Sequence, residues 1–316
     1  MKTSHLKFVL FRACLMSFLL IWGYSTVLAQ RDSLAVVHAS WKVRKVAPGV
    51  WLKQAWFNQS LFQANQNISI LEIRMNGRNR IDVAAEPQVL KNTSTFGAEH
   101  RALAALNGTF FDMKNGGSVD YIRIDGQVLN ESRKDEPGKR RFQQNAAVVT
   151  NSHKLSIESW DGHDDWESNL KGEDVMVSGP LLLKNKMQAR IDSAGFCLNR
   201  HPRTAVAVKG KWVFLVTVDG RNNKAAGMSL FELAKLLKWL GAVDAVNLDG
   251  GGSTTLWVSG FPEGGVINHP SDNNAMTKSK DYKPGMDLDN LAADVKKWDH
   301  SGERQVANVL LLNKKK

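Results

Sequence analysis

Hydrophobic and polar residues alternate in several short stretches of this chain, which is the pattern of β-strands with one buried face. In the first hundred residues the pattern occurs at 49–57, 67–75 and 81–85, and Asn76-Gly77 predicts a turn between the second and third stretches. Residues 93–101 carry polar entry residues and are a weaker helix candidate. This part of the chain is therefore expected to consist mainly of strands.

The middle of the chain contains two predicted hairpins. Asp125-Gly126 is a strong turn signal, and it lies between apolar stretches at 119–124 and 127–129. Residues 146–149 and 155–160 form a second pair of apolar stretches joined by a polar segment. Further strands are predicted at 175–177, 181–184, 204–208 and 306–312.

Residues 212–248 show a strand, a helix and a second strand in order. Ser229 and Glu232 have the spacing of a capping box at the start of the helix, and Gly241 closes it. The apolar face of the helix consists of Phe231, Leu233, Leu236, Leu237 and Leu240. We predict an α+β fold with a mixed β-sheet core and flanking helices.

Residues 1–29 have the features of a signal peptide. Lys2, Lys7 and Arg12 precede an apolar run at 15–21, and the segment ends in small residues at Ala29. We expect cleavage after Ala29, a secreted or periplasmic location, and no stable membrane insertion after processing. The mature chain is expected to comprise N-terminal strands at 30–95 that pack on a main domain at 96–313.

The net charge limits the expected binding partners, and the cysteine content limits the expected disulfide and metal sites. The formal charge is +11, and it becomes +8 without the three basic residues of the leader, which has no acidic residue. The basic residues are dispersed apart from 139–141 and 314–316, and no nucleic-acid motif accompanies them, so we expect no nucleic-acid partner. Anionic envelope polymers are the expected electrostatic partners. Cys197 is the one cysteine left after processing; it is expected to be buried, and disulfide and Cys-based metal sites are excluded.

The most informative segment is 247–255, with the sequence Asn-Leu-Asp-Gly-Gly-Gly-Ser-Thr-Thr between two apolar stretches. Three consecutive glycines cost ordering entropy, so they are typical of a sharp turn or of close approach to a ligand. Exposed amides in such a turn can cradle an anion, and Asp249 adds a carboxylate beside them. The alternative is a tight turn in which Asp249 caps its own backbone.

A second acidic residue has an equivalent position. Asp219 ends the strand before the helix, and Asp249 ends the strand after it. A crossover between parallel neighbours would put both ends at one edge of the sheet, roughly 5–10 Å apart, a range that includes the carboxylate pairs of glycosidases. Alternatively, each aspartate only stabilises its own turn.

Cationic and polar residues flank these strand ends. Arg203 and Arg221 can each grip a phosphate through parallel N–H bonds, or form a surface ion pair. Asn107 and Asp112 lie in a further strand-end loop, and His201 is expected to be structural. Because His-x-x-x-His, cysteine-pair and dense Asp-x-Asp patterns are absent, we expect no metal and no cofactor.

An ordered set of motifs then identifies a family. The set is NGTFFD at 107–112, HPRTAV at 201–206, VDGR at 218–221, GMSLFELA at 227–234, NLDGGGSTT at 247–255, NHPSD at 268–272 and ERQVAN at 303–308. It resembles the phosphodiester glycosidase family over about residues 100–312 and not over 31–95. Thr109 and Ala207 stand where glycine is more usual, and neither change removes a charged group.

The resemblance implies a sugar-1-phosphodiester substrate cleaved between the anomeric carbon and the bridging oxygen. Arg203, Arg221 and the amides of 250–252 would then neutralise the departing phosphate, and Asp219 or Asp249 would steady the oxocarbenium-like sugar or activate water. Which aspartate is acid, base or nucleophile stays open. The expected substrate-binding residues are Asn107, Asp112, Thr204, Asn247, Gly250, Gly251, Gly252, Ser253, Thr254, Ser271 and Asp272.

Two other functions are compatible with these residues. A noncatalytic envelope glycan-binding protein would use the same pocket, with Trp212, Trp239 and Trp257 as stacking faces if they are not core residues. A metal-dependent phosphodiesterase would instead cut the P–O bond. The bond that is broken distinguishes the two enzymes.

Overall fold

The computed structural model describes residues 30–133, 142–152, 154–272 and 297–314. The predicted signal peptide and the basic run at 139–141 lie outside the described residues. Within the described ranges, no helix has both the length and the apolar character needed to cross a membrane.

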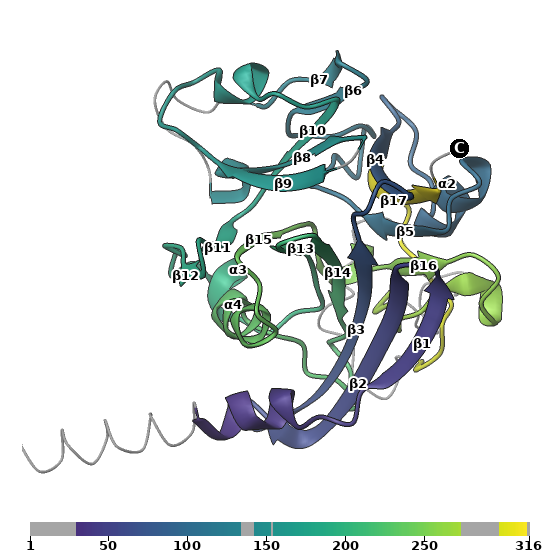
Figure 1. The fold of residues 1–316 in the computed structure, drawn as a ribbon, viewed down its shortest axis with the longest axis vertical. Coiled ribbons are helices and arrows are strands. Elements are labelled where there is room, and N and C mark those ends of the chain that lie inside the picture. The colour runs from purple at the N-terminus through teal and green to yellow at the C-terminus, as the bar shows by residue number, and fades with distance from the viewer. Residues whose placement is uncertain (1–29, 134–141, 153, 273–296, 315–316) are drawn as a thin grey trace, which may run out of the picture.

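The largest sheet has eight strands, and it runs through the centre of the molecule (Figure 1). Its order is β1-β2-β3-β14-β13-β15-β11-β12. The strands are β1 (Lys42–Ala47), β2 (Val50–Leu61), β3 (Ala64–Arg74), β11 (Leu181–Lys184), β12 (Met187–Gln188), β13 (Arg203–Lys209), β14 (Trp212–Val218) and β15 (Asp244–Asn247).

Two smaller sheets pack beside it. The five-stranded sheet, at the top of Figure 1, has the order β7-β6-β10-β8-β9, and the four-stranded sheet has the order β16-β5-β17-β4. The strands of the first are β6 (Ile122–Ile124), β7 (Gln127–Asn130), β8 (Ala146–Asn151), β9 (Lys154–Ser159) and β10 (Asp174–Ser178). Those of the second are β4 (Asn79–Ala85), β5 (Ala104–Asn107), β16 (Leu256–Val258) and β17 (Asn308–Lys314).

Helices in the described residues are short and few. A first helical segment covers residues 30–37. It is followed by the α-helices α2 (Thr93–Glu99), α3 (Gly195–Leu198) and α4 (Leu230–Trp239). Short 3-10 helices occupy Phe142–Gln144, Trp166–Asn169, Gly251–Ser253 and Glu263–Gly265. The predicted capping box of α4 is present in full, because Ser229 Oγ accepts from the Glu232 amide and the Glu232 carboxylate accepts from the Ser229 amide.

The main core lies where the three sheets meet. Leu52, Leu71, Val148, Leu215 and Leu310, which come from all three sheets, belong to one buried cluster. A second cluster joins the opposite face of the eight-stranded sheet to the apolar side of α4. Burial of this apolar surface is the main favourable term for folding and fixes the strand ends relative to one another.

The α+β class is confirmed, and most predicted strands are present within two or three residues of their expected bounds. The expectation that the strands before Asp219 and Asp249 are parallel neighbours is wrong. β13 pairs antiparallel with both β14 and β15, so β14 and β15 run in the same direction but are not neighbours. All hydrogen-bonded strand pairs among the described residues are antiparallel.

Residues 42–85 are part of the same sheets as the rest of the chain. β3 pairs with β14 along seven registered positions, from Trp212↔Arg74 to Val218↔Ile68, and β4 pairs with β17. The expected division at residue 95 therefore does not coincide with a break in either sheet.

Asp174 links the five-stranded and four-stranded sheets. One carboxylate oxygen accepts from the Val83 amide on β4 and from the Thr150 hydroxyl, and the other accepts from the Asp125 amide. Burial raises the pKa of Asp174, and the backbone donors oppose this shift.

Replacing Asp174 with alanine is predicted to destabilise the fold by about 2–4 kcal/mol, because three donors lose their acceptor. Urea unfolding measures this loss. The neighbouring Glu173→Ala, at a side chain that is 42% exposed, is the matched control and should change stability by less than about 1 kcal/mol. Equal effects of the two changes would contradict the linking role.

Candidate active site

The site lies at one edge of the eight-stranded sheet, where β14 and β15 end on either side of the start of β13. Arg203 pairs with Val218, and Ala205 pairs with Asn247. Asp219 and Asp249 thus share this edge, and the intervening strand separates their strands by about 10 Å.

The glycine run approaches its surroundings more closely than a side chain would allow. A Cβ on Gly250 would lie 2.7 Å from the Pro202 carbonyl oxygen, and Gly251 has a φ of +61°. The Gly251 amide donates to Pro202 O, and the Gly250 amide donates to Asp249 Oδ1. Two of the three amides expected to cradle an anion are therefore used within the protein.

Two guanidinium groups lie against this loop. A Cβ on Gly251 would be 3.0 Å from Nη1 of Arg221, and one on Gly252 would overlap with Arg304 and Asp272. Arg304 forms a bidentate ion pair with Asp272, with distances of 2.7 Å and 3.2 Å. The absence of side chains from the loop is what allows both cations to reach it.

Asp249 is half-buried beside these cations. Burial raises its pKa to about 6, while the Ser253 hydroxyl, the Arg304 and Arg221 charges and the Gly250 amide lower it. A carboxyl group with a pKa near neutrality can hold or accept a proton at physiological pH.

Asp219 has a different environment, because it is 1% exposed and its two oxygens accept from four donors. Oδ1 accepts from the Asn268 side chain and the His269 amide, and Oδ2 accepts from the Asn67 side chain at 2.7 Å and lies 3.0 Å from His269 Nδ1. Its geometry is that of a residue that positions its neighbours.

Arg203 is not placed for the direct phosphate contact that the sequence predicted. It is 1% exposed, and its guanidinium donates to the carbonyl oxygens of Phe196, Asn199 and Met228. Burial lowers its pKa to about 10. The guanidinium therefore stabilises the backbone beneath the site, and Arg221 and Arg304 are the cations at the glycine loop.

Four of the expected sugar-binding residues are instead buried supports of the loop. Asn107 Nδ2 donates to Asp249 O at 2.7 Å, and its Oδ1 accepts from the Thr204 hydroxyl, which also contacts Thr254. Asn247 donates to backbone carbonyls at Gly179 and Leu248. Their exposed fractions of 0–1% leave no surface for direct contact with a ligand.

Asp112, Ser253 and Ser271 are the remaining polar candidates, and Ser253 is 0% exposed, so it too has no surface for direct contact with a ligand. Asp112 accepts from the Lys114 and Asn115 amides, from the Asn115 side chain and from Arg133, and these donors hold its pKa well below the usual range. It organises its own turn. The Ser271 hydroxyl is buried and has no hydrogen-bond partner in the described structure.

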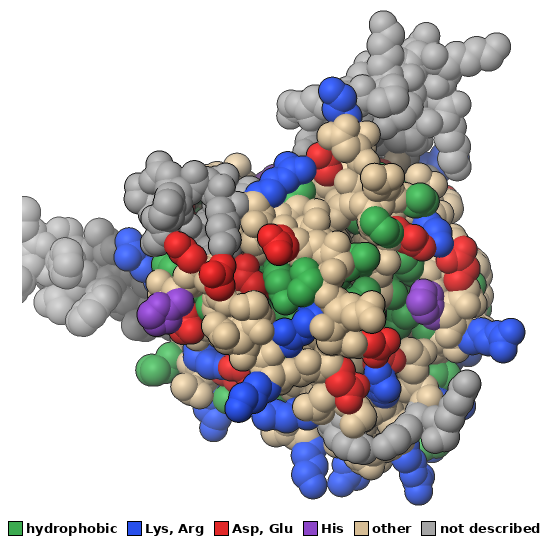
Figure 2. Space-filling model, turned by 90° about the horizontal axis from the view of Figure 1, so that it is seen from above, with side chains coloured by type: hydrophobic (Ala, Val, Ile, Leu, Met, Phe, Trp, Pro, Cys, Tyr) green, Lys and Arg blue, Asp and Glu red, His purple; other side chains and the backbone are tan. Residues whose placement is uncertain are grey.

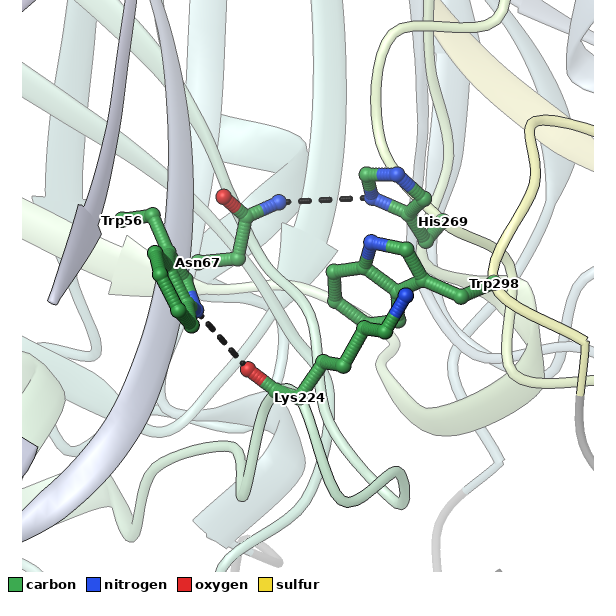
Figure 3. A pocket seen from close by; sticks show the side chains of 5 residues that line it. All are labelled: Trp56, Asn67, Lys224, His269 and Trp298. Atoms are coloured by element: carbon green, nitrogen blue, oxygen red, sulfur yellow. Dashed lines mark hydrogen bonds between the residues drawn. The ribbon is translucent and has the colours of Figure 1, made fainter. Parts of the chain in front are cut away.

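A cavity of about 400 Å³ opens beside Asp219, and sequence reasoning missed all five residues that line it. They are Trp56, Asn67, Lys224, His269 and Trp298 (Figure 3). His269 stacks on Trp298 with ring centroids 3.9 Å apart. NHPSD at 268–272 was the available signal for His269; Arg304, also missed as a site residue, lies in ERQVAN.

Other side chains with possible site roles are placed elsewhere. Trp212 packs on Trp51, Trp239 stacks on Phe62, and the Trp257 indole donates to Gly264 O.

In the described part of the chain, no group of three or more His, Cys, Asp and Glu side chains is arranged to hold a metal ion. Figure 2 shows acidic and basic side chains interspersed on the face that it presents. Cys197 is buried, as expected.

A family model described as phosphodiester glycosidase matches residues 100–281, which is more than half of the chain. This chain belongs to the phosphodiester glycosidase family. The matched region includes both aspartates, Arg221 and the glycine run, and it excludes Trp56, Asn67, Trp298 and Arg304.

One curated relative of this phosphodiester glycosidase family member is the N-acetylglucosamine-1-phosphodiester alpha-N-acetylglucosaminidase of Mus musculus. It is 27% identical over 177 residues, which are 53% of this chain and 33% of the relative. The chain thus matches about a third of that protein's length.

Solved structures share the fold. The catalytic domain of the zebrafish enzyme of the same name, auto-inhibited by its pro-peptide, has a TM-score of 0.60 at 20% identity and covers 87% of this chain and 84% of its own. A hypothetical protein from Synechocystis has a TM-score of 0.58 at 15% identity, and the match covers 86% of this chain and 63% of that protein's chain.

Replacing Arg203 with lysine is predicted to destabilise this phosphodiester glycosidase family member by about 2–4 kcal/mol, because one ammonium cannot reproduce the fork that serves three carbonyls. Arg221→Lys is the matched control and should alter stability by less than about 1 kcal/mol. Urea unfolding at one pH compares the two, and an Arg203→Lys protein as stable as the parent would refute the structural role.

Proposed function

We propose that this protein hydrolyses the anomeric C–O bond of a sugar-1-phosphodiester and releases the free sugar and a phosphomonoester. The observation that carries the proposal is the juxtaposition of Asp249 with Arg221, Arg304 and the side-chain-free loop 250–252. The family and the named relatives support the same class of reaction.

The cations suit a phosphate leaving group. As the bond between the anomeric carbon and the bridging oxygen breaks, both bonding electrons pass to the phosphate. Arg221 and Arg304 stabilise that charge, and groups placed in advance for this purpose contribute about 2.7–4 kcal/mol each in comparable sites. Such a leaving group needs little protonation, so a strong general acid is not required.

Asp249 is assigned the role of general base. In its ionised form it accepts a proton from the water that attacks the anomeric carbon, while the sugar passes through an oxocarbenium-like state. Ser271, which is 8% exposed, is assigned to a sugar hydroxyl, since its own hydroxyl has no partner in the described residues. Ser253 is 0% exposed and is not assigned a contact with the sugar. Asp219 positions Asn67 and His269.

The proposal includes export and an envelope substrate. Residues 1–29 have the charge, apolar run and small-residue end of a cleaved leader. The formal charge of +8 without the leader favours association with an anionic glycan that carries the phosphodiester.

Hydrolysis in ¹⁸O-labelled water tests the reaction. Label is expected at the anomeric carbon of the released sugar and not in the phosphomonoester, with no loss of rate on addition of a chelator. Label in the phosphate together with chelator sensitivity would indicate a metal-dependent phosphodiesterase. Binding of the glycan with no product would indicate a binding protein.

The pH dependence tests Asp249. Because the carboxylate must be ionised and its pKa is about 6, kcat/KM is predicted to fall tenfold per pH unit below about pH 6. Asp249→Asn should lower kcat/KM by roughly 10²–10⁴-fold and remove this acidic limb. An unchanged acidic limb in the variant would exclude the assignment.

The same pKa predicts an effect on stability. A carboxyl group whose pKa is raised on folding, from 3.8 to about 6, destabilises the fold progressively as pH rises through that window. Asp249→Asn should therefore be more stable than the parent at pH 7.5, by on the order of 1–3 kcal/mol, and equally stable near pH 3.5. Thermal unfolding at both pH values measures the difference.

A further inference from the structure

The cavity beside Asp219 has two aromatic walls from distant parts of the chain. Trp56 projects from β2, and its indole N–H donates to Lys224 O at 3.0 Å, which fixes the ring (Figure 3). Trp298 lies opposite and is held by stacking on His269 with an interplanar angle of 11°. Trp56 is 57% exposed, although its ring is oriented by a hydrogen bond. A large exposed ring that is held in place is typical of a binding surface.

The polar groups of the cavity are held from behind by Asp219. Because an ionised carboxylate only accepts, His269 donates from Nδ1 to Asp219 Oδ2, and in the neutral ring Nε2 is an acceptor. Within the described residues Nε2 makes no hydrogen bond. The Asn67 amide is also anchored to Asp219. Fixed polar groups between two aromatic faces give orientation to a ligand.

The charge at the rim is positive. Lys224 Nζ lies 5.9 Å from the centroid of the Trp298 ring, and in the described structure it forms no ion pair. The five residues that line the cavity include no carboxylate. An anionic group on the ligand would therefore find an attractive partner and no repulsive one at the wall.

We propose that this cavity binds a pyranose ring that carries a negatively charged substituent. The C–H faces of a pyranose are apolar and suit the electron-rich faces of Trp56 and Trp298. Hydroxyl groups reach Asn67 and His269, and the charged substituent reaches Lys224. A volume of about 400 Å³ is within the range of small-ligand sites.

The cavity adjoins the loop assigned to catalysis. Asp219 lies behind the cavity, and two residues later Arg221 contacts Gly251. Asn268 also joins the two regions, because its side chain donates to both Asp219 Oδ1 and Thr254 O. We assign the cavity to a second sugar unit of the same substrate. Only this assignment rests on the proposed function.

Calorimetric titration with glucose 6-phosphate, glucose and inorganic phosphate tests the site without turnover. Glucose 6-phosphate should bind more tightly than either of the other two. Trp56→Ala should weaken it about tenfold or more, because one aromatic face is lost. Lys224→Gln should weaken glucose 6-phosphate about tenfold while leaving glucose unchanged.

Matched controls lie nearby. Trp51→Ala on the same strand and Lys211→Ala in the turn after β13 should leave all three affinities unchanged. Asp249→Asn should also retain binding, so that a failure of hydrolysis does not affect this result. No binding of glucose 6-phosphate, or binding that is indifferent to both Trp56→Ala and Lys224→Gln, overturns the proposal. Inorganic phosphate binding as tightly as the sugar phosphate overturns it as well.

Discussion

The hydrogen bonds of one buried amide, Asn107, hold the site together. Its Nδ2 group donates to the backbone oxygen of Asp249, and its Oδ1 accepts from Thr204 and from the Thr255 amide. These partners belong to β13 and to the loop between β15 and β16, whereas Asn107 ends β5 in another sheet. Because Asn107, Thr204 and Thr255 are buried, leaving any of their polar groups unpaired costs about 1–3 kcal/mol. The glycine loop is thereby fixed where two sheets meet.

The two strand-end aspartates illustrate how environment divides roles between identical side chains. The carboxylate of Asp219 is buried and accepts from four donors, so it orients Asn67, Asn268 and His269. Asp249 is half-buried, with a pKa raised to about 6, and is placed beside cations that can act on a ligand. Equivalent positions at the ends of parallel strands do not imply equivalent chemistry, because the loops that follow supply different partners.

Local patterns predicted much of the fold. The hairpin at Asp125-Gly126 and the capping box at Ser229 depend on neighbours in sequence, so they could be inferred without coordinates. The order of strands could not, because β13 enters between β14 and β15 through long-range pairing.

For the site, the chain positions of the polar residues were informative but the directions of their side chains were not. Arg203 and Arg221 look alike in sequence, yet Arg203 donates to three backbone carbonyls and Arg221 lies against Gly251. Trp56 and Trp298 carry no local signal at all, since their common cavity is formed only when segments 242 residues apart come together.

The shared sheets also set the smallest piece of the chain that can behave as an independent unit. An excised segment 100–281 would lack β3, which pairs with β14, and β17, which pairs with β5, as well as β4, which pairs with β17. It would present rows of unsatisfied N–H and C=O groups along strands whose side chains are largely apolar. Such a surface recruits further chains by strand addition. Aggregation is thus the expected fate of a fragment cut at the boundaries of family similarity.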